Sequence, residues 1–122
     1  MKSVLVVDDS EITRSFISSA IEDIGDIEIS EASSGFEALK VLPANSFDLV
    51  MVDINMPDIN GLELINFIKK DNKYRDIPII IVSTESSEED RKRGMSLGAF
   101  AYLTKPVKTE ELEALVKKAL GI

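Results

Sequence analysis

The stretch from Phe47 to Leu64, FDLVMVDINMPDINGLEL, contains the pattern that decides the fold. Leu49–Val52 is a short, continuous apolar run, and such a run predicts a strand that is buried on both faces. Asp53 and a series of turn-forming residues follow the run at once. From about Gly61 to Lys70 the apolar residues recur at three-residue spacing, which predicts a helix. A buried strand, a loop and a helix in this order form the repeating unit of a parallel α/β sheet.

The same alternation extends along the whole chain. The predicted strands are Ser3–Val7, Ile27–Ala32, Asp48–Val52, Ile77–Val82 and Ala99–Leu103. The predicted helices run from about Ile12 to Ile24, from Ser34 to a stop at Pro43, and over Gly61–Lys70, Ser87–Leu97 and Thr109–Leu120. Strands that are each followed by a helix predict a parallel sheet covered on both faces, and the right-handed crossover rule leaves few topologies. A doubly wound, flavodoxin-like α/β sheet of five strands is the leading candidate.

Length and composition set limits on the function. A chain of 122 residues is long enough for one domain with a hydrophobic core. No apolar run approaches the roughly 18 residues that a membrane span needs, so we expect no membrane insertion. The chain has no His and no Cys, which excludes Ser-His-Asp and Cys-His catalysis and is compatible with a cytoplasmic protein. A net charge of −8 argues against binding to nucleic acid.

Polar residues gather where four of the five predicted strands end. The first strand is followed by Asp8 and Asp9, the third by Asp53, the fourth by Ser83 and Thr84, and the fifth by Thr104, Lys105 and Pro106. In open α/β sheets, ligands bind outside the carboxyl ends of the strands. The second strand ends with Glu31, Ser33 and Ser34, which suggest nothing specific.

Each of these residues also has an ordinary structural interpretation. The aspartates could cap helices or begin turns, the hydroxyls could be loop residues, and Lys105 could be a surface lysine. As a set, they favour a site. Three neighbouring carboxylates repel one another unless a cation joins them, and Mg²⁺ prefers such oxygen ligands. A lysine and a hydroxyl can hold a phosphoryl group, and an ionised aspartate is a nucleophile that needs no base. The set therefore predicts phosphoryl transfer.

Four motifs, VLVVDDS, VDINMPDING, IIIVST and AYLTKPV, resemble in sequence and order the receiver domain of bacterial response regulators. The resemblance covers the whole chain and implies the strand order 2-1-3-4-5. It further implies that a partner histidine kinase phosphorylates Asp53. Asp9 and Asp53 would bind Mg²⁺ through their carboxylates, Asn55 through its backbone carbonyl, and Asp8 mainly through water.

The resemblance also assigns roles in switching. Lys105 would contact the phosphoryl group, and Ser83 would donate a hydrogen bond to it, with Thr84 as the less favoured neighbour. Tyr102 matches the aromatic residue that turns inward when this hydroxyl moves, and the Lys105–Pro106 bond is similar to one that is cis in the family. Asn55 and Glu85 match a pair that accompanies rapid loss of phosphate in some chemotaxis-type regulators.

We therefore expect residues 1–122 to form a single receiver domain without an output domain, which catalyses only its own phosphorylation and dephosphorylation. Its partners would be a sensor histidine kinase and a target protein that docks on the face of the fourth helix, fifth strand and fifth helix. Chemotaxis, a phosphorelay, transcription-linked signalling and excision from a longer regulator all fit the sequence.

Three other functions compete with this prediction. Haloacid-dehalogenase-like phosphatases carry a second aspartate two residues after the first, where this chain has Asn55. A protein-interaction module with a degenerate site would not need the complete set of acids, hydroxyl and lysine. A flavin or nucleotide carrier is the weakest alternative, because the chain has neither a G-x-G-x-x-G motif nor a Walker A loop.

Overall fold

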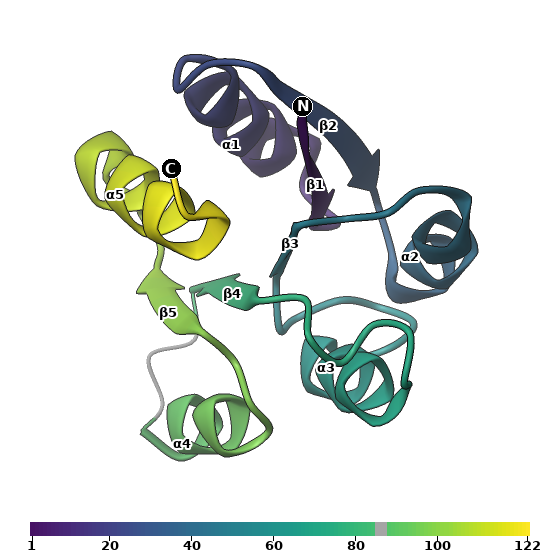
Figure 1. Cartoon of the computed structure of the whole chain (residues 1–122). Helices are drawn as coiled ribbons and strands as arrows, with labels where there is room; N and C mark the ends of the chain where they lie inside the picture. The colour runs from purple at the N-terminus through teal and green to yellow at the C-terminus, as the bar shows by residue number, and fades with distance from the viewer. Residues whose placement is uncertain (85–87) are drawn as a thin grey trace.

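Five parallel strands form one sheet in the order β2-β1-β3-β4-β5 (Figure 1). The computed structural model describes residues 1–84 and 88–122. The strands are β1 (Lys2–Val7), β2 (Ile27–Ala32), β3 (Leu49–Val52), β4 (Ile79–Ser83) and β5 (Ala101–Thr104). The helices are α1 (Glu11–Glu22), α2 (Gly35–Val41), α3 (Gly61–Lys70), α4 (Glu88–Ser96) and α5 (Thr109–Leu120), and a 3₁₀ turn covers Leu42–Ala44. The doubly wound fold and its strand order are as predicted.

The sheet separates two hydrophobic cores. In Figure 1, α1 and α5 cover one face of the sheet, and α2, α3 and α4 cover the other. All residues of β3 and β4 are buried, because these strands have neighbours on both edges and helices on both faces. The side chains of β3 alternate between the two cores, with Val50 and Val52 in one and Leu49 and Met51 in the other. A continuous apolar run is therefore what this central strand requires.

The bounds of four strands differ from the prediction: those of β1 and β3 differ by one residue at the start, and β4 and β5 begin two residues later and end one residue later than predicted. β4 begins at Ile79 and not at Ile77, because Pro78 has no N–H and joins the sheet only by accepting from the backbone N–H of Val50 at 3.1 Å. β5 begins at Ala101 and not at Ala99, since Gly98 turns the chain with a φ of 108° just before it. Apolar residues before a strand thus pack into the core without joining the sheet.

Side chains accept hydrogen bonds from backbone N–H groups at the start of α2. Ser34 caps α2 by accepting from the backbone N–H of Glu37 at 3.1 Å. The carboxylate of Glu37 accepts from the N–H of Ser33, one residue before the position that a capping box would use. In α1 the helix ends at Glu22, before Ile24 and Gly25. No helix in the described ranges is both long enough and apolar enough to cross a membrane.

Candidate phosphorylation site at the carboxyl edge of the sheet

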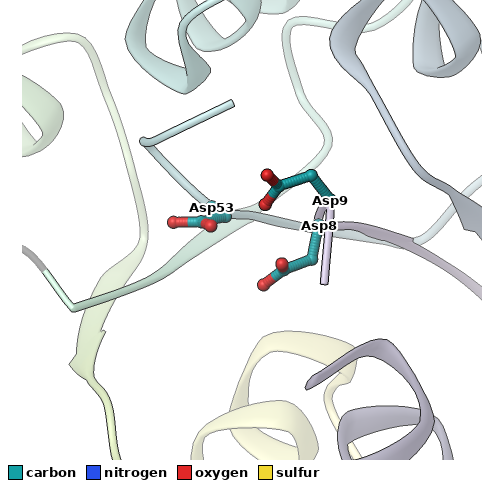
Figure 2. Close-up of side chains that lie close together, drawn as sticks. All are labelled: Asp8, Asp9 and Asp53. Carbon is teal, nitrogen blue, oxygen red and sulfur yellow. The ribbon is translucent and has the colours of Figure 1, made fainter. Parts of the chain in front are cut away.

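The pairing of β1 with β3 brings three aspartates together. Val7 lies opposite Val52, so Asp8 and Asp53 each follow directly on neighbouring strands. The backbone N–H of Asp53 donates to the carbonyl of Val7 at 3.0 Å, which extends the ladder to the site itself. One carboxylate oxygen from each of Asp8, Asp9 and Asp53 lies within 4.8 Å of the others (Figure 2). Asp8 and Asp53 are buried, whereas Asp9 is exposed.

Lys105 places a cation against two of these carboxylates. Its Nζ atom lies 2.9 Å from Oδ2 of Asp8 and 3.4 Å from Oδ2 of Asp53. Lys105 follows β5, the edge strand beside β4, and its backbone N–H donates to the carbonyl of Ser83 at 2.9 Å. The Lys105–Pro106 bond is cis, as the resemblance implied. Three strand ends are therefore linked at one point.

The surroundings of Asp53 shift the pKa of its carboxyl group upward. Burial, and then the charge of Asp8, raise the pKa of Asp53, while Lys105 and the backbone N–H of Asn55 lower it without cancelling the rise. Burial by itself would lower the pKa of Lys105, but its hydrogen bond to Asp8 and the charges of Asp53 and Asp8 outweigh burial, so that pKa is raised. One lysine thus offsets only part of the negative charge.

The donor atoms of the cluster suit a hard divalent cation. The available ligands are carboxylate oxygens, and Asp9 lies open to solvent at the mouth of the site. Mg²⁺ is commonly held by one or two carboxylates and keeps several waters. A cation here would also relieve the repulsion that raises the pKa of Asp53. The residues present therefore fit a Mg²⁺ ion.

The loop between β3 and α3 holds Asp53 in place. Oδ1 of Asp53 accepts from the backbone N–H of Asn55 at 3.3 Å, and the N–H of Gly61 donates to the carbonyl of Ile54 at 2.8 Å. Asn60 caps α3 by accepting from the N–H of Leu62 at 2.7 Å. The turn residues of NMPDING thus fold the loop back onto the end of β3.

The remaining predicted residues that the structure describes lie at or near the same edge. Ser83 is the last residue of β4 and is fully buried, and Thr84 after it is exposed. Tyr102 is buried in β5, opposite Ile81, and the guanidinium carbon of Arg91 lies 5.3 Å from the centre of its ring. Glu85 lies outside the described residues.

The model of the response regulator receiver domain matches residues 4–117. The chain belongs to the response regulator receiver family. The chemotaxis protein CheY1 of Helicobacter pylori is 34% identical over 119 residues, which cover 97% of this chain and 96% of that protein. A CheY homologue of Campylobacter jejuni is 35% identical over 119 residues, which cover 97% of this chain and 92% of that protein. The structure of the chemotaxis response regulator CheY4 of Vibrio cholerae is 34% identical, with a TM-score of 0.89 over 98% of this chain and 99% of that one.

These matches establish a receiver domain of chemotaxis type. Phosphoryl acceptance, phosphorylation by histidine kinases, Mg²⁺ binding at an acidic pocket and the binding of downstream targets are general properties of such receivers. The family acts as a signalling switch.

The sequence did not indicate the roles of Arg14 and Asp58 in this receiver domain. Arg14 contacts the backbone of Asp8 and the carboxylate of Glu31, and Asp58 accepts hydrogen bonds from the start of α2. Arg14 is the only Lys or Arg between Lys2 and Lys40, and this isolated positive charge close to Asp8 and Asp9 in the sequence could have indicated its role. Asp58 lies in a run of turn residues, and nothing in its position distinguishes it from an ordinary turn aspartate.

Proposed function

We propose that Asp53 of this receiver domain accepts a phosphoryl group from a histidine kinase and that the modified domain switches a docking surface. The observation that carries the proposal is the buried carboxylate of Asp53 beside Asp8, Asp9 and the ammonium group of Lys105. A nucleophile, two further acids and a cation are the groups that phosphoryl transfer to a carboxylate requires.

In this proposal an oxygen of Asp53 attacks the phosphorus of the donor. The new bond joins that oxygen to phosphorus, and the bond from phosphorus to the leaving group breaks with its electron pair on the leaving group. The leaving group is the imidazole of a kinase histidine or the carboxylate of a small acyl phosphate. Lys105, which already contacts Asp53, stabilises the negative charge on the phosphoryl oxygens.

Asp8, Asp9, Asp53 and the backbone carbonyl of Asn55 would hold the Mg²⁺ ion. The carboxylates of Asp9 and Asp53 would bind it directly, and Asp8 would act mainly through water. The bound ion supplies positive charge that reduces repulsion between the carboxylates and the phosphate. Asp8 keeps Lys105 directed into the site through the 2.9 Å ion pair.

The switch in this proposal starts at Ser83, which donates a hydrogen bond to the phosphoryl group. Movement of Ser83 repositions Tyr102 and changes the face of α4, β5 and α5, where a target protein docks. Two observations favour this face: Arg91 of α4 packs over the ring of Tyr102, and two large apolar side chains are exposed, Met95 in α4 and Phe100 just before β5. We place this exchange in the cytoplasm.

The lifetime of the phosphorylated state would depend on Asn55 and Glu85, the pair that the resemblance relates to rapid loss of phosphate. Asn55 is exposed and lies two residues after Asp53, where it can meet the water that hydrolyses the acyl phosphate. Asn55 and Glu85 together are proposed to set the rate of this self-dephosphorylation.

The proposal predicts that the purified protein acquires one phosphoryl group from acetyl phosphate in the presence of Mg²⁺. Intact-mass spectrometry measures the gain, with excess EDTA as one control and Asp53→Asn as the other. Both controls should remain unmodified, because each removes one participant in the transfer. An unmodified wild-type protein under conditions that trap acyl phosphates would contradict the proposal and favour an interaction module that is never phosphorylated.

A further inference from the structure

Asp9 is the aspartate of the cluster whose carboxylate has the fewest hydrogen-bond donors among the described residues. The carboxylate of Asp8 accepts from the backbone N–H of Ser10 at 2.8 Å and from Lys105, and that of Asp53 accepts from Asn55 and Lys105. Among the described residues, none donates a hydrogen bond to the side chain of Asp9, which is exposed. The placement of Asp9 therefore depends on its backbone.

Arg14 fixes the backbone that leads to Asp9. Its Nη1 atom donates to the carbonyl oxygen of Asp8 at 2.8 Å. This carbonyl belongs to the planar peptide group that joins Asp8 to Asp9, so the hydrogen bond sets the orientation of that plane. The other backbone group of Asp8, its N–H, donates to the carbonyl of Ala32 in β2 at 3.1 Å. Together these bonds determine the direction in which the chain enters Asp9.

Arg14 is itself held by a carboxylate from the neighbouring strand. Its Nε atom donates to Oε1 of Glu31 at 3.0 Å, and the hydroxyl of Ser18 donates to Oε2 of the same residue at 3.1 Å. Ser18 is buried, and the side chain of Arg14 is only 15% exposed. The guanidinium group thus uses two nitrogens in fixed directions, which a lysine cannot reproduce.

We propose that Arg14, anchored by Glu31 and Ser18, is a positioning residue that orients Asp9 to bind a divalent cation. This inference rests on the proposed function of the cluster. The expected change in metal affinity on loss of Arg14 is opposite in sign to the change that charge alone predicts. The positive charge of Arg14 by itself repels a metal ion, so its loss would tighten binding if only charge mattered. Loss of the hydrogen bond to Asp8 frees the peptide before Asp9 and weakens binding.

The experiment measures Mn²⁺ affinity from the electron paramagnetic resonance signal of the free ion. We expect Arg14→Gln and Arg14→Lys each to raise the Kd by about tenfold, the lower end of the range for residues that orient metal ligands. Arg14→Lys keeps the positive charge but cannot form both hydrogen bonds of the guanidinium group. A higher Kd for Mn²⁺ in this variant therefore results from the lost geometry and not from a change of charge. Arg75→Gln is the matched control, because it removes one exposed guanidinium far from the site in sequence, and its Kd should equal that of the wild type.

A double-mutant cycle tests whether Glu31 acts through Arg14. Glu31→Gln should raise the Kd in the wild-type background and leave it unchanged in the Arg14→Gln background. An unchanged or lower Kd in Arg14→Gln overturns the inference, as does an equal effect of Glu31→Gln in both backgrounds. Thermal unfolding in EDTA verifies that each variant is folded. If the Arg14 variants do not fold, Ser18→Ala, which frees one oxygen of Glu31, takes their place, and an unchanged Kd in it overturns the inference.

The two proposals fail in different ways. A wild-type protein that binds no Mn²⁺ and accepts no phosphoryl group contradicts the proposed function, and the role of Arg14 falls with it. A wild-type protein that does both, with Arg14 variants of unaltered affinity, contradicts the role of Arg14 alone.

Discussion

Two aspartates at opposite ends of one strand show how the surroundings decide the role of a residue. Asp48 precedes β3, and its Oδ2 atom accepts from the backbone N–H of Ser3 at 2.8 Å, which satisfies a backbone donor at the start of β1. Asp53 follows β3 and meets Asp8 and Lys105. Both are acids beside the same apolar run. Only the position at the carboxyl edge, where several strand ends meet, makes Asp53 a candidate for chemistry.

Asp58 stabilises the start of a helix from a distant loop. Its carboxylate accepts from the backbone N–H of Phe36 at 2.9 Å and of Gly35 at 3.1 Å, at the N-terminus of α2. The hydrogen bond from Phe36, and with it those from backbone N–H groups of Ile59 and Gly35, lower the pKa of Asp58 from 3.8 to about 2. The folded state therefore favours the charged form of this carboxyl group.

This shift predicts how stability depends on pH. The folded-state pKa lies below the unfolded value, so the contribution of Asp58 is complete above pH 3.8 and is lost as the pH falls toward about 2. Asp58→Asn should lower the urea midpoint at neutral pH, and its difference from the wild type should shrink through this acidic window. Asp26→Asn is the control, because Asp26 is exposed and its carboxylate accepts no hydrogen bond from other described residues. A difference that stays constant with pH would contradict the assignment.

At the level of elements, the start of α3 lies against the backbone that directly follows β3. A Cβ atom on Gly61 would overlap the carbonyl oxygen of Asp53 and would lie 2.7 Å from Cα of Ile54. These are backbone atoms, and they cannot move without moving the end of β3. Gly61 thus lets the first turn of α3 sit directly against the residue that carries the predicted phosphoryl group.

We predict that Gly61→Ala destabilises the protein by about 1–3 kcal/mol, the usual cost of overpacking, and slows phosphorylation of Asp53. Gly94→Ala is the matched control. Its added methyl group would meet Cδ1 of Ile81, the end of a side chain that can shift, and alanine is favoured in a helix by about 1 kcal/mol. Urea unfolding should show a small change for Gly94→Ala. Equal losses in both variants would contradict the argument that backbone contact makes Gly61 special.

The sequence predicted the elements better than their ends. Apolar periodicity identified each strand and helix, but Ile77 and Ala99 were assigned to strands that begin two residues later. The apolar pattern indicates which residues are buried, whereas a residue belongs to a strand only if its backbone also forms the hydrogen bonds of the sheet. Pro78 has no backbone N–H to donate such a bond. The start of α4 was predicted at Ser87, which lies outside the described residues.

At the scale of the whole molecule, the alternating pattern and the crossover rule together predicted which residues meet. Parallel strands place all their carboxyl ends at one edge, so Asp8, Asp53 and Lys105 could be grouped before any coordinates were known. The contact of Arg14 with Glu31 could not be predicted from the sequence, because it depends on the side chains of α1 and on the register of β2 against β1. The sequence accordingly shows nothing specific at the end of the second strand, where Glu31 anchors Arg14.

Chemical trapping can identify the residue that carries the phosphoryl group, which we propose to be Asp53. After incubation with acetyl phosphate and Mg²⁺, sodium borohydride reduces an aspartyl phosphate to homoserine, and peptide mass spectrometry locates the converted residue. If Asp53 is the phosphorylated residue, homoserine appears at position 53 and nowhere else. Homoserine at position 8 or 9, or no conversion at position 53 of a protein that has gained phosphoryl mass, would contradict it.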